Sequence, residues 1–359
     1  MRQGRVTVLA PLAILALLAA ACTSTATASP GATPAVSASE ADAGSGAPSA
    51  SGAAASNASP GSTAGVGTSS VPCLPAGEAP GASGASGPPP CPSLPTAFAR
   101  NIPFTPPGNC GGTQCQLQLD VYHPTQAAPG GPWPVVLAIP GGPAPLGARA
   151  GLSGLALSLA ALGTVVFTAD YRSMPAQNAG FPQTFEDVAC AVRTARAMAA
   201  QYGGDPARVT LAANSLGGWP SAVIAFSTQP FPLDATNCLA QAGSSRPDAF
   251  VGVAGVYTLD KIDPGYLDAF FGGTRQTAPG AWAAGDPYAI VNANRNEPIP
   301  VTLVGGDRDQ TVPLASTQLF TGYLGAAGYA AQLTTVQGAN HDTVLTAPQT
   351  VAAILAAVR

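Results

Sequence analysis

Ser215 is the residue of this chain best placed to act as a nucleophile. It lies within residues 213–217, ANSLG, which fit the pattern Gly-x-Ser-x-Gly except that Ala213 takes the first glycine position. In that pattern the serine occupies a sharp, strained turn between a strand and a helix, and small residues around it let the two elements approach. The turn exposes the serine oxygen beside a helix N-terminus, where N–H groups favour negative charge. The alternative is an ordinary strand–turn–helix in which Ser215 caps the helix.

The chain has two histidines that could act as a base, His123 and His341. Where a serine on such a turn works with an acid and a histidine, the order along the chain is serine, acid, histidine. His123 precedes Ser215, so only His341 satisfies this order. We therefore expect His341 to take the proton of Ser215 and His123 to have no catalytic role.

The acid should follow the strand before the His341 loop, and residues 305–313 contain two candidates, Asp307 and Asp309. One carboxylate can brace the loop while the other accepts the ring N–H of the histidine and orients it. In a loop of the form Asp-x-x-Val-Pro, the aspartate three residues before the valine is the partner of the histidine. This points to Asp309, with Asp307 as the alternative. Asp342 cannot easily reach around its own backbone to the neighbouring ring.

The elements that position these residues alternate along the chain. Continuous apolar runs that end in glycine-rich turns are typical of strands buried on both faces of a sheet. Such runs cover 135–139, 165–169, 209–213, 250–256, 301–304 and 331–336, after a half-exposed strand at 117–122. Helical patterns cover 152–162, 184–201, 216–227, 314–324 and 347–358. The alternation predicts an α/β fold with a mostly parallel central sheet and helices on both faces. Ser215, Asp309 and His341 all follow the carboxyl ends of predicted strands, where such sheets bind ligands.

The composition divides the 359 residues into unequal parts. Residues 23–95 contain no Phe, Trp or Tyr, and only three charged side chains. Such a segment cannot bury enough apolar surface to offset the entropy of ordering it. We expect a signal peptide at 1–21, a Ser/Ala/Gly/Pro-rich tether at 22–95 and one catalytic domain at 96–359. The net charge of −4, with scattered Arg and Lys, argues against binding to nucleic acid or to an anionic membrane surface.

The N-terminus has the features of an export signal. Arg2 and Arg5 precede a short apolar stretch at 6–21, which is too short for a comfortable membrane span. Small residues then lead into Cys22, which resembles a bacterial lipobox, although Leu18 lies one place earlier than usual. We expect Cys22 to carry a lipid that holds the protein at the outer face of the membrane. A plain signal peptide and secretion is the alternative.

The six remaining cysteines form an even set in an exported chain, which indicates disulfides. Fifteen pairings are possible. We favour a loop in the proline-rich region, a short closed turn, and a bridge between two helices that flank the nucleophile. No Cys-x-x-Cys occurs and there are only two histidines, so a metal site is a poor alternative. The favoured pairs are Cys73–Cys91, Cys110–Cys115 and Cys190–Cys238.

Together, these segments resemble the α/β-hydrolase carboxylesterases, in particular the hormone-sensitive-lipase-like enzymes and the bacterial feruloyl- or acetyl-esterase-like enzymes. The resemblance covers nearly all of residues 115–359. It rests on 119–122 (LDVY), 170–172 (DYR), 181–187 (FPQTFED), 202–209 (YGGDPARV), 215–218 (SLGG), 306–313 (GDRDQTVP) and 338–341 (GANH). It implies an α/β-hydrolase fold.

The resemblance also implies an oxyanion hole after the strand at 135–139. Members of the family carry His-Gly-Gly-Gly there, whereas this chain has Pro-Gly-Gly-Pro at 140–143. The N–H groups of Gly141 and Gly142 could still point at the developing oxyanion, with that of Leu216 as a further donor. Each such donor is worth about 3 kcal/mol in the transition state. The alternative is a Pro/Gly turn that merely ends a strand.

We therefore expect a serine hydrolase that cleaves small-molecule carboxylic esters through an acyl-enzyme and needs no cofactor or metal. Five aromatic residues within 257–297 are expected to form part of the substrate wall or to serve packing, namely Tyr266, Phe270, Phe271, Trp282 and Tyr288. Two other functions remain open. One is a serine peptidase of the prolyl-oligopeptidase type, and the other is a noncatalytic, hydrolase-like binding protein of the cell surface. The sequence predicts no particular oligomeric state.

Overall fold

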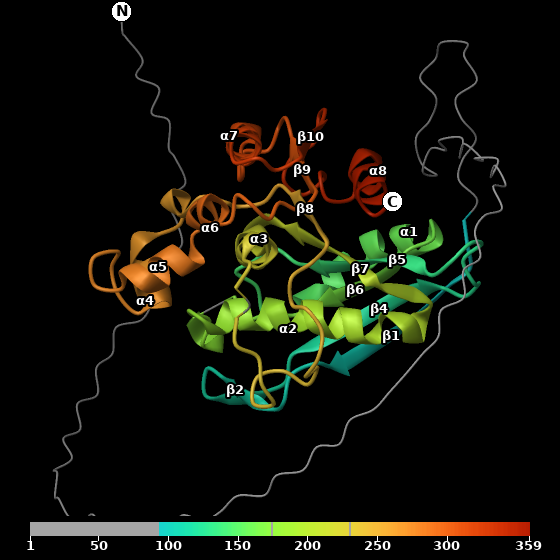
Figure 1. The fold of residues 1–359 in the computed structure, drawn as a ribbon, viewed down its shortest axis with the longest axis horizontal. Helices are drawn as coiled ribbons and strands as arrows, with labels where there is room; N and C mark the ends of the chain where they lie inside the picture. The colour runs from blue at the N-terminus through green and yellow to red at the C-terminus, as the bar shows by residue number, and fades with distance from the viewer. Residues whose placement is uncertain (1–92, 174, 230) are drawn as a thin grey trace, which may run out of the picture. The chain divides into compact units, whose positions relative to one another are not determined.

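An eight-stranded sheet runs through the centre of the domain (Figure 1). The computed structural model describes residues 93–173, 175–229 and 231–359. The strand order is β1-β4-β6-β5-β7-β8-β9-β10; β4 is antiparallel to both of its neighbours, and the pairs from β6 to β10 are parallel. The predicted mostly parallel sheet is confirmed. The strands are β1 (Thr96–Pro103), β4 (Gln118–Pro124), β5 (Trp133–Ile139), β6 (Val165–Ala169), β7 (Gly204–Asn214), β8 (Ala249–Val253), β9 (Val301–Gly306) and β10 (Ala331–Val336).

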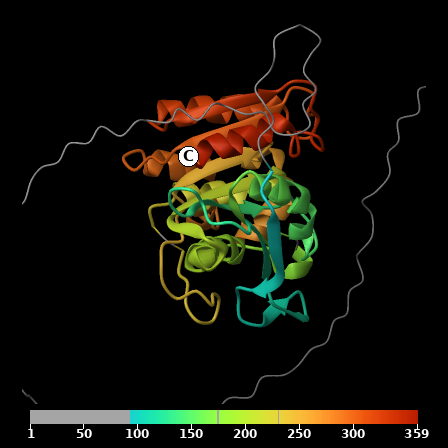
Figure 2. The ribbon, with the colours of Figure 1, turned by 90° about the vertical axis from the view of Figure 1, so that its right-hand side faces the viewer.

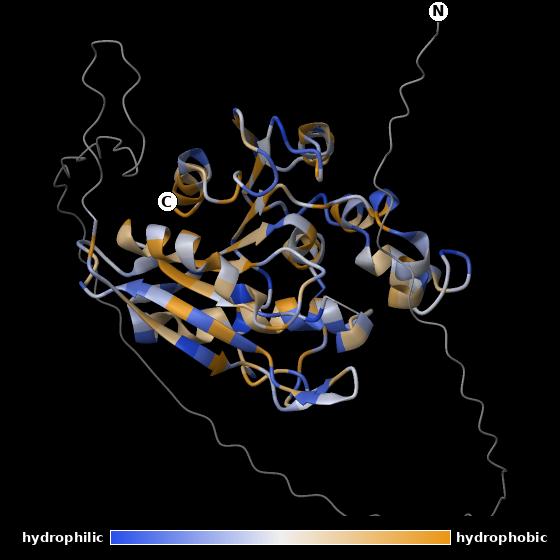
Figure 3. Ribbon diagram, turned by 180° about the vertical axis from the view of Figure 1, so that it is seen from behind, coloured by the Kyte–Doolittle hydropathy of each residue, from blue (hydrophilic) through white to orange (hydrophobic). Residues whose placement is uncertain are grey.

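Helices cover both faces of this sheet (Figure 2). The pleat of β7 sends Leu211 and Ala213 to one face and Ala212 to the other, and both sets are buried. This two-sided burial explains why the strands are continuous apolar runs, and the central strands are accordingly mainly hydrophobic in Figure 3. Residues of α1 (Ser153–Ala161) and α8 (Pro348–Ala357) pack on the face of Ala212, and those of α2 (Gln183–Met198), α3 (Gly218–Phe226) and α7 (Leu314–Ala326) on the other.

The strand order places two loops of the candidate site next to each other. β5 lies between β6 and β7, so the chain winds outward from β5 in both directions. Ile139 and Ala213 are register partners at the carboxyl ends of β5 and β7. The Gly141-Gly142 turn and Ser215 therefore leave the sheet at the same level, at the kind of crevice where α/β sheets bind ligands.

Several elements were not predicted. β1 is an edge strand, and β2 (Gly108–Cys110) and β3 (Thr113–Cys115) form a separate two-stranded hairpin. Within 257–297 the chain forms three short helices, α4 (Pro264–Phe271), α5 (Pro279–Gly285) and α6 (Pro287–Ala293). The run predicted to extend to residue 256 ends at Val253, because Ala254 takes a φ of 46° and turns the chain out of the sheet. Short 3-10 turns connect the main elements: η1 (Ala148–Leu152), η2 (Pro175–Gln177), η3 (Ala199–Tyr202), η4 (Ser215–Gly217) and η5 (Leu259–Lys261).

The N-terminal predictions fall outside the described residues. They are the signal peptide at 1–21, lipidation at Cys22, the tether up to residue 92, and the Cys73–Cys91 bridge. These remain predictions of the sequence. Within the part of the chain that the structure describes, no helix has the length and apolar character needed to cross a membrane.

Candidate active site

Ser215 lies on the sharp turn between β7 and α3 and has a φ of 51°, a left-handed value that is unusual for a residue other than glycine. A Cβ added at Gly217 would collide with the carbonyl oxygen of Pro140, and one added at Gly218 would lie 2.8 Å from Gly255 Cα. The carbonyl of Ser215 accepts the N–H of Val256 at 3.0 Å. Close approach of neighbouring backbone segments therefore fixes the backbone of the strained serine. The helix predicted from residue 216 begins at Gly218, after the 3-10 turn η4.

The structure brings Ser215, His341 and Asp309 together from three separate strand ends. His341 Nε2 lies 2.9 Å from Ser215 Oγ, and His341 Nδ1 lies 2.7 Å from Asp309 Oδ2. His341 follows β10, and Asp309 follows β9. The Asp309 side chain is fully buried, whereas that of His341 is 20 % exposed. A hydroxyl, an imidazole and a carboxylate in this sequence of contacts can transfer a proton from the serine to the histidine.

The two carboxylates of the acid loop make different contacts. Asp309 Oδ1 accepts the N–H groups of Thr311 and Val312 at 2.9 and 2.8 Å, which leaves Oδ2 directed at His341. Asp307 instead accepts the N–H of Gly338 at 2.6 Å, in the loop that leads to His341. Asp309 thus contacts the ring, and Asp307 ties the two loops together.

The Gly141-Gly142 turn faces Ser215 from the end of β5. A Cβ added at Gly141 would lie 3.0 Å from Ser215 Cβ. Gly142 and Leu216 line the same cleft as Ser215. The Gly142–Pro143 peptide bond is cis. Proline has no N–H, so the backbone donors of this region belong to Gly141, Gly142 and Leu216.

The cleft at Ser215 has a volume of about 1040 Å³. One wall comes from the segment that follows β8 and from α6, the other from the acid loop and the start of α7. Of the aromatic residues predicted to form a wall or to serve packing, Tyr266 and Tyr288 line the cleft, whereas Phe270, Phe271 and Trp282 are buried against other rings. The following lining residues were not predicted from the sequence: Tyr257, Thr258, Asp260, Lys261, Ile262, Asp263, Gln310, Ala315, Ser316 and Leu319.

A buried ion-pair cluster lies beside the turn. Arg149 Nε donates to Asp120 Oδ1 at 3.0 Å, and its Nη1 pairs with Asp170 Oδ2. Asp170 Oδ1 also accepts the N–H of Gly147 at 2.8 Å. Burial raises the pKa of Asp170, and the adjacent Arg149 favours its charged form. The cluster therefore anchors the loop that follows Gly142 to β4 and β6. This role of Arg149 was not predicted from the sequence.

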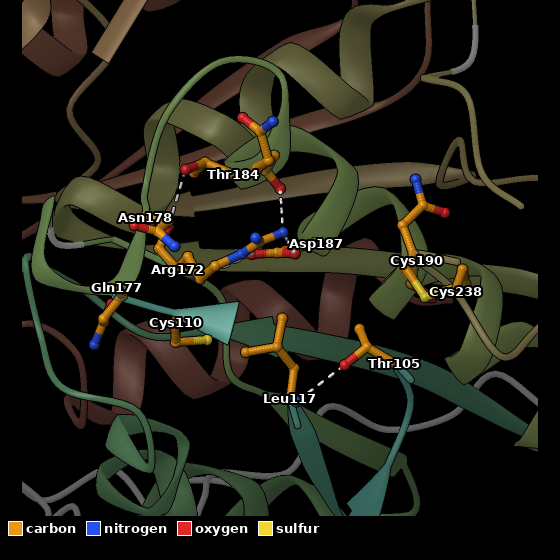
Figure 4. Close-up of polar contacts among 12 residues, drawn as sticks. Thr105, Cys110, Leu117, Arg172, Gln177, Asn178, Thr184, Asp187, Cys190 and Cys238 are labelled. Carbon is orange, nitrogen blue, oxygen red and sulfur yellow. Dashed lines mark hydrogen bonds and ion pairs between the residues drawn. A yellow bond between two sulfur atoms is a disulfide. The ribbon is translucent and has the colours of Figure 1, made fainter. Parts of the chain in front are cut away.

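A second buried pair joins the loop after β6 to α2 (Figure 4). Arg172 donates from Nε and Nη2 to both carboxylate oxygens of Asp187, at 2.8 and 2.7 Å, and its backbone N–H donates to Oδ2 at 3.0 Å. Burial raises the pKa of Asp187, opposed by these hydrogen bonds. Two-pronged contacts of this kind fix geometry as well as charge.

The described cysteines form the pairs Cys110–Cys115 and Cys190–Cys238. The expectation that Cys190–Cys238 joins two helices is wrong in one respect. Cys190 lies on α2, but Cys238 lies in the loop between α3 and β8. This long, irregular connection has no helical periodicity of its own, and the bridge ties it to the core.

His123 lies on β4, where its Nδ1 is 2.9 Å from the carbonyl oxygen of Pro124 and its ring packs near Tyr202. The structure thus leaves it out of the Ser215 cluster. Across residues 93–359, apart from 174 and 230, no three His, Cys, Asp or Glu side chains gather in a way that could hold a metal ion.

Two curated relatives and one solved structure show what the chain is similar to. Esterase LipQ of Mycobacterium tuberculosis (strain ATCC 25618 / H37Rv) is 28% identical over 246 residues, which cover 65% of this chain and 54% of LipQ. Esterase LipC of the same organism is 30% identical over 220 residues, covering 58% and 52%. The chain thus spans about half the length of these curated relatives. Esterase 2 of Thermogutta terrifontis, phosphonylated by sarin, superposes with a TM-score of 0.54 at 22% identity, covering 66% of this chain and 87% of that one.

The predicted α/β-hydrolase fold is confirmed by this structural similarity. The model of the BD-FAE family matches residues 119–324, more than half of the chain, and includes β5, β7, the Ser215 turn and the acid loop. This match supports the resemblance to carboxylesterases of this fold, and the chain belongs to the BD-FAE family.

Proposed function

We propose that this protein is a serine esterase that hydrolyses carboxylic esters at Ser215. The observation that carries the proposal is the pair of contacts at His341, 2.9 Å to Ser215 Oγ and 2.7 Å to Asp309 Oδ2, at the wall of an open cleft. The curated relatives LipQ and LipC are named esterases, and the Thermogutta enzyme is described as phosphonylated by sarin, which supports the same chemistry here.

The reaction has two steps. His341 takes the proton of Ser215 as the serine oxygen attacks the ester carbonyl, and the negative oxygen that forms is held by the N–H groups of Gly141, Gly142 and Leu216. The C–O bond to the alcohol breaks, and His341 returns the proton to the leaving alkoxide. Water then attacks the acyl-enzyme with His341 again as base, which releases the acid and restores Ser215. Asp309 keeps the imidazole oriented with its Nδ1 proton toward the carboxylate throughout.

The cleft favours esters with a sizeable apolar group. Ile262, Tyr266, Val312 and Leu319 provide apolar surface along it, while the volume of about 1040 Å³ lies at the upper end for small-molecule sites. The hydroxyl of Tyr266 donates to the carbonyl of Ser173 at 3.3 Å, and burial raises the pKa of this phenol to about 12.

The decisive experiment compares Ser215→Ala with the unaltered protein on p-nitrophenyl butyrate and on a fluorophosphonate probe. We expect Ser215→Ala to lose both hydrolysis and labelling. Ser316→Ala is the matched control, because Ser316 lines the same cleft without contacting His341. It should keep both.

Three results would contradict the proposal. Labelling of Ser215→Ala at the rate of the unaltered protein would place the nucleophile elsewhere. Absence of turnover and of labelling in the unaltered protein would favour the noncatalytic binding protein. Faster cleavage of peptide amides than of esters would favour the peptidase.

A further inference from the structure

The Gly141-Gly142 turn is held by a residue that does not line the cleft. Ser173 Oγ accepts the N–H of Ala144 at 3.0 Å and donates to the carbonyl of Ala144 at 3.2 Å. A Cβ added at Gly142 would lie 3.0 Å from the same hydroxyl oxygen. Ser173 therefore touches the chain on both sides of Pro143, at the point where the turn ends.

Gln177 fixes Ser173 in turn. Its Oε1 accepts the backbone N–H of Ser173 at 3.0 Å, and its Nε2 donates to the carbonyl of Ala144 at 3.1 Å. Ser173 and Gln177 are 4 % and 8 % exposed, so little water competes for these bonds. The two side chains join the loop after β6 to the loop after β5.

The segment that carries Gln177 rests against the β2–β3 hairpin. A side chain at Gly111 would collide with the carbonyl oxygen of Ala176, so the two backbones are in direct contact. Asn178 Nδ2 donates to the carbonyl of Asn109 at 3.2 Å. Figure 4 shows Gln177 and Asn178 beside Cys110, whose bond to Cys115 closes the hairpin.

We propose that this hairpin, through Gln177 and Ser173, positions the oxyanion turn. The inference rests on the proposed function, because it assigns the turn a role in ester hydrolysis. Backbone donors stabilise an oxyanion only when they are already aimed at its position. A turn of two glycines between prolines has no side chains with which to hold itself, and an error of about 1 Å in such a group can cost about 100-fold in rate. Ser173 and Gln177 are thus positioning residues.

The contact between the hairpin and Ala176 is tested by a pair of neighbouring glycines. Gly111 and Gly112 both have left-handed φ values, +67° and +87°, so alanine introduces comparable backbone strain at each. Only at Gly111 would the new Cβ meet Ala176, whereas nothing lies within 4 Å at Gly112. We expect Gly111→Ala to lower kcat on p-nitrophenyl butyrate about 10-fold with little change in KM, and Gly112→Ala to keep kcat.

The contacts of Gln177 with Ser173 and Ala144 are tested by substitutions at two glutamines. Gln177→Met keeps the length of the side chain and removes its hydrogen bonds to Ser173 and to Ala144. Gln241→Met removes a comparable bond outside the hairpin, the one from Gln241 Nε2 to the carbonyl of Cys238. We expect Gln177→Met to lower kcat between about 10- and 100-fold. Its affinity for butylboronic acid, which forms a tetrahedral adduct with the serine, should fall in parallel with kcat/KM. Gln241→Met should change neither.

Each variant is measured in its full chain, well below its own Tm. If Gln177→Met does not fold, Gln177→Glu replaces it, since the glutamate keeps the acceptor for Ser173 and loses the donor toward Ala144. The inference is overturned if Gly111→Ala and the Gln177 variant keep kcat and boronate affinity. It is equally overturned if Gly112→Ala and Gln241→Met lose as much. Failure of the proposed function looks different, because the unaltered protein would then neither turn over the ester nor react with the fluorophosphonate.

Discussion

The candidate site has two halves that are built differently. One half holds Ser215, Asp309 and His341, whose side chains bond directly to one another across three strand ends. The other half is the Gly141-Gly142 turn, which has no functional side chain and is held from behind by Ser173 and Gln177. In the first half the groups that would do the chemistry also fix each other's positions.

The difference shows which part of a site can lose activity through a substitution outside the cleft. A network of mutually bonded side chains fails when a member is removed. A backbone turn fails when its support moves, and this support lies outside the cleft. The following predictions, from the largest expected effect to the smallest, test whether the two halves depend on their surroundings in these different ways.

Removing the acid should cost most. In Asp309→Asn the amide would present an N–H group to His341 Nδ1 and favour the wrong tautomer, so we expect kcat to fall about 10⁴-fold in ester hydrolysis. Asp307→Asn is the control, because an amide oxygen can still accept the N–H of Gly338. A similar loss in both variants would mean that the loop as a whole, and not the contact at His341, sets the rate.

The boundary between the halves is tested at Gly217. Alanine there would collide with the carbonyl of Pro140, which lies directly before the oxyanion turn. We expect Gly217→Ala to lower kcat/KM about 100-fold and to reduce the free energy of unfolding. Gly322→Ala, in open space on α7, should keep activity and raise stability by about 0.5–1 kcal/mol, as for a helical glycine. Unchanged kinetics in Gly217→Ala would show that the halves move independently.

Crowding the turn directly should have a smaller effect. A Cβ at Gly142 would lie 3.0 Å from Tyr171 Oη and 3.0 Å from Ser173 Oγ, so we expect Gly142→Ala to shift the turn and to lower kcat about 10-fold. Tyr171→Phe removes one of these atoms and should partly restore the rate in the double variant, as a double-mutant cycle would measure. If the two changes simply add, Tyr171 does not limit the position of the turn.

His123 belongs to neither half and provides the baseline. It lies on β4 and contacts Pro124 and Tyr202. His123→Ala should keep kcat within about twofold. Its contacts with Pro124 and Tyr202 involve none of the three residues Ser215, Asp309 and His341, and residues that share no partners have little energetic coupling. A larger loss, measured alongside His341→Ala, would show that the second histidine acts on the reaction through the sheet.

Much of the first half could be predicted from the sequence because its signals are local. Strands buried on both faces are apolar runs, and the residues that follow them gather at one edge of a parallel sheet. Order along the chain then separated His341 from His123. The Asp-x-x-Val-Pro form separated Asp309 from Asp307, and in the structure Asp309 lies 2.7 Å from the ring. The small residues around Ser215 likewise reflect a contact between neighbouring elements.

The support of the turn could not be predicted in this way. Ser173, Gln177 and Gly111 belong to segments without periodicity, and the hairpin at 108–115 is too short to show a strand pattern. Arg149 carries no sign in the sequence that it pairs with Asp120 and Asp170. The helices α4, α5 and α6 after β8 could not be predicted either, because each is only seven or eight residues long and so shows too little helical periodicity.

The sequence by itself therefore determined the type of sheet, the order of the three polar residues along it and the turn that carries Ser215. Each of these depends on a pattern within one segment or on the order of segments. Only the tertiary structure decided which loops touch, namely that the hairpin meets Ala176 and that Gln177 bonds to Ala144. Such contacts join residues more than thirty positions apart, and hydrogen bonds and backbone collisions of this kind leave no periodic trace in the chain.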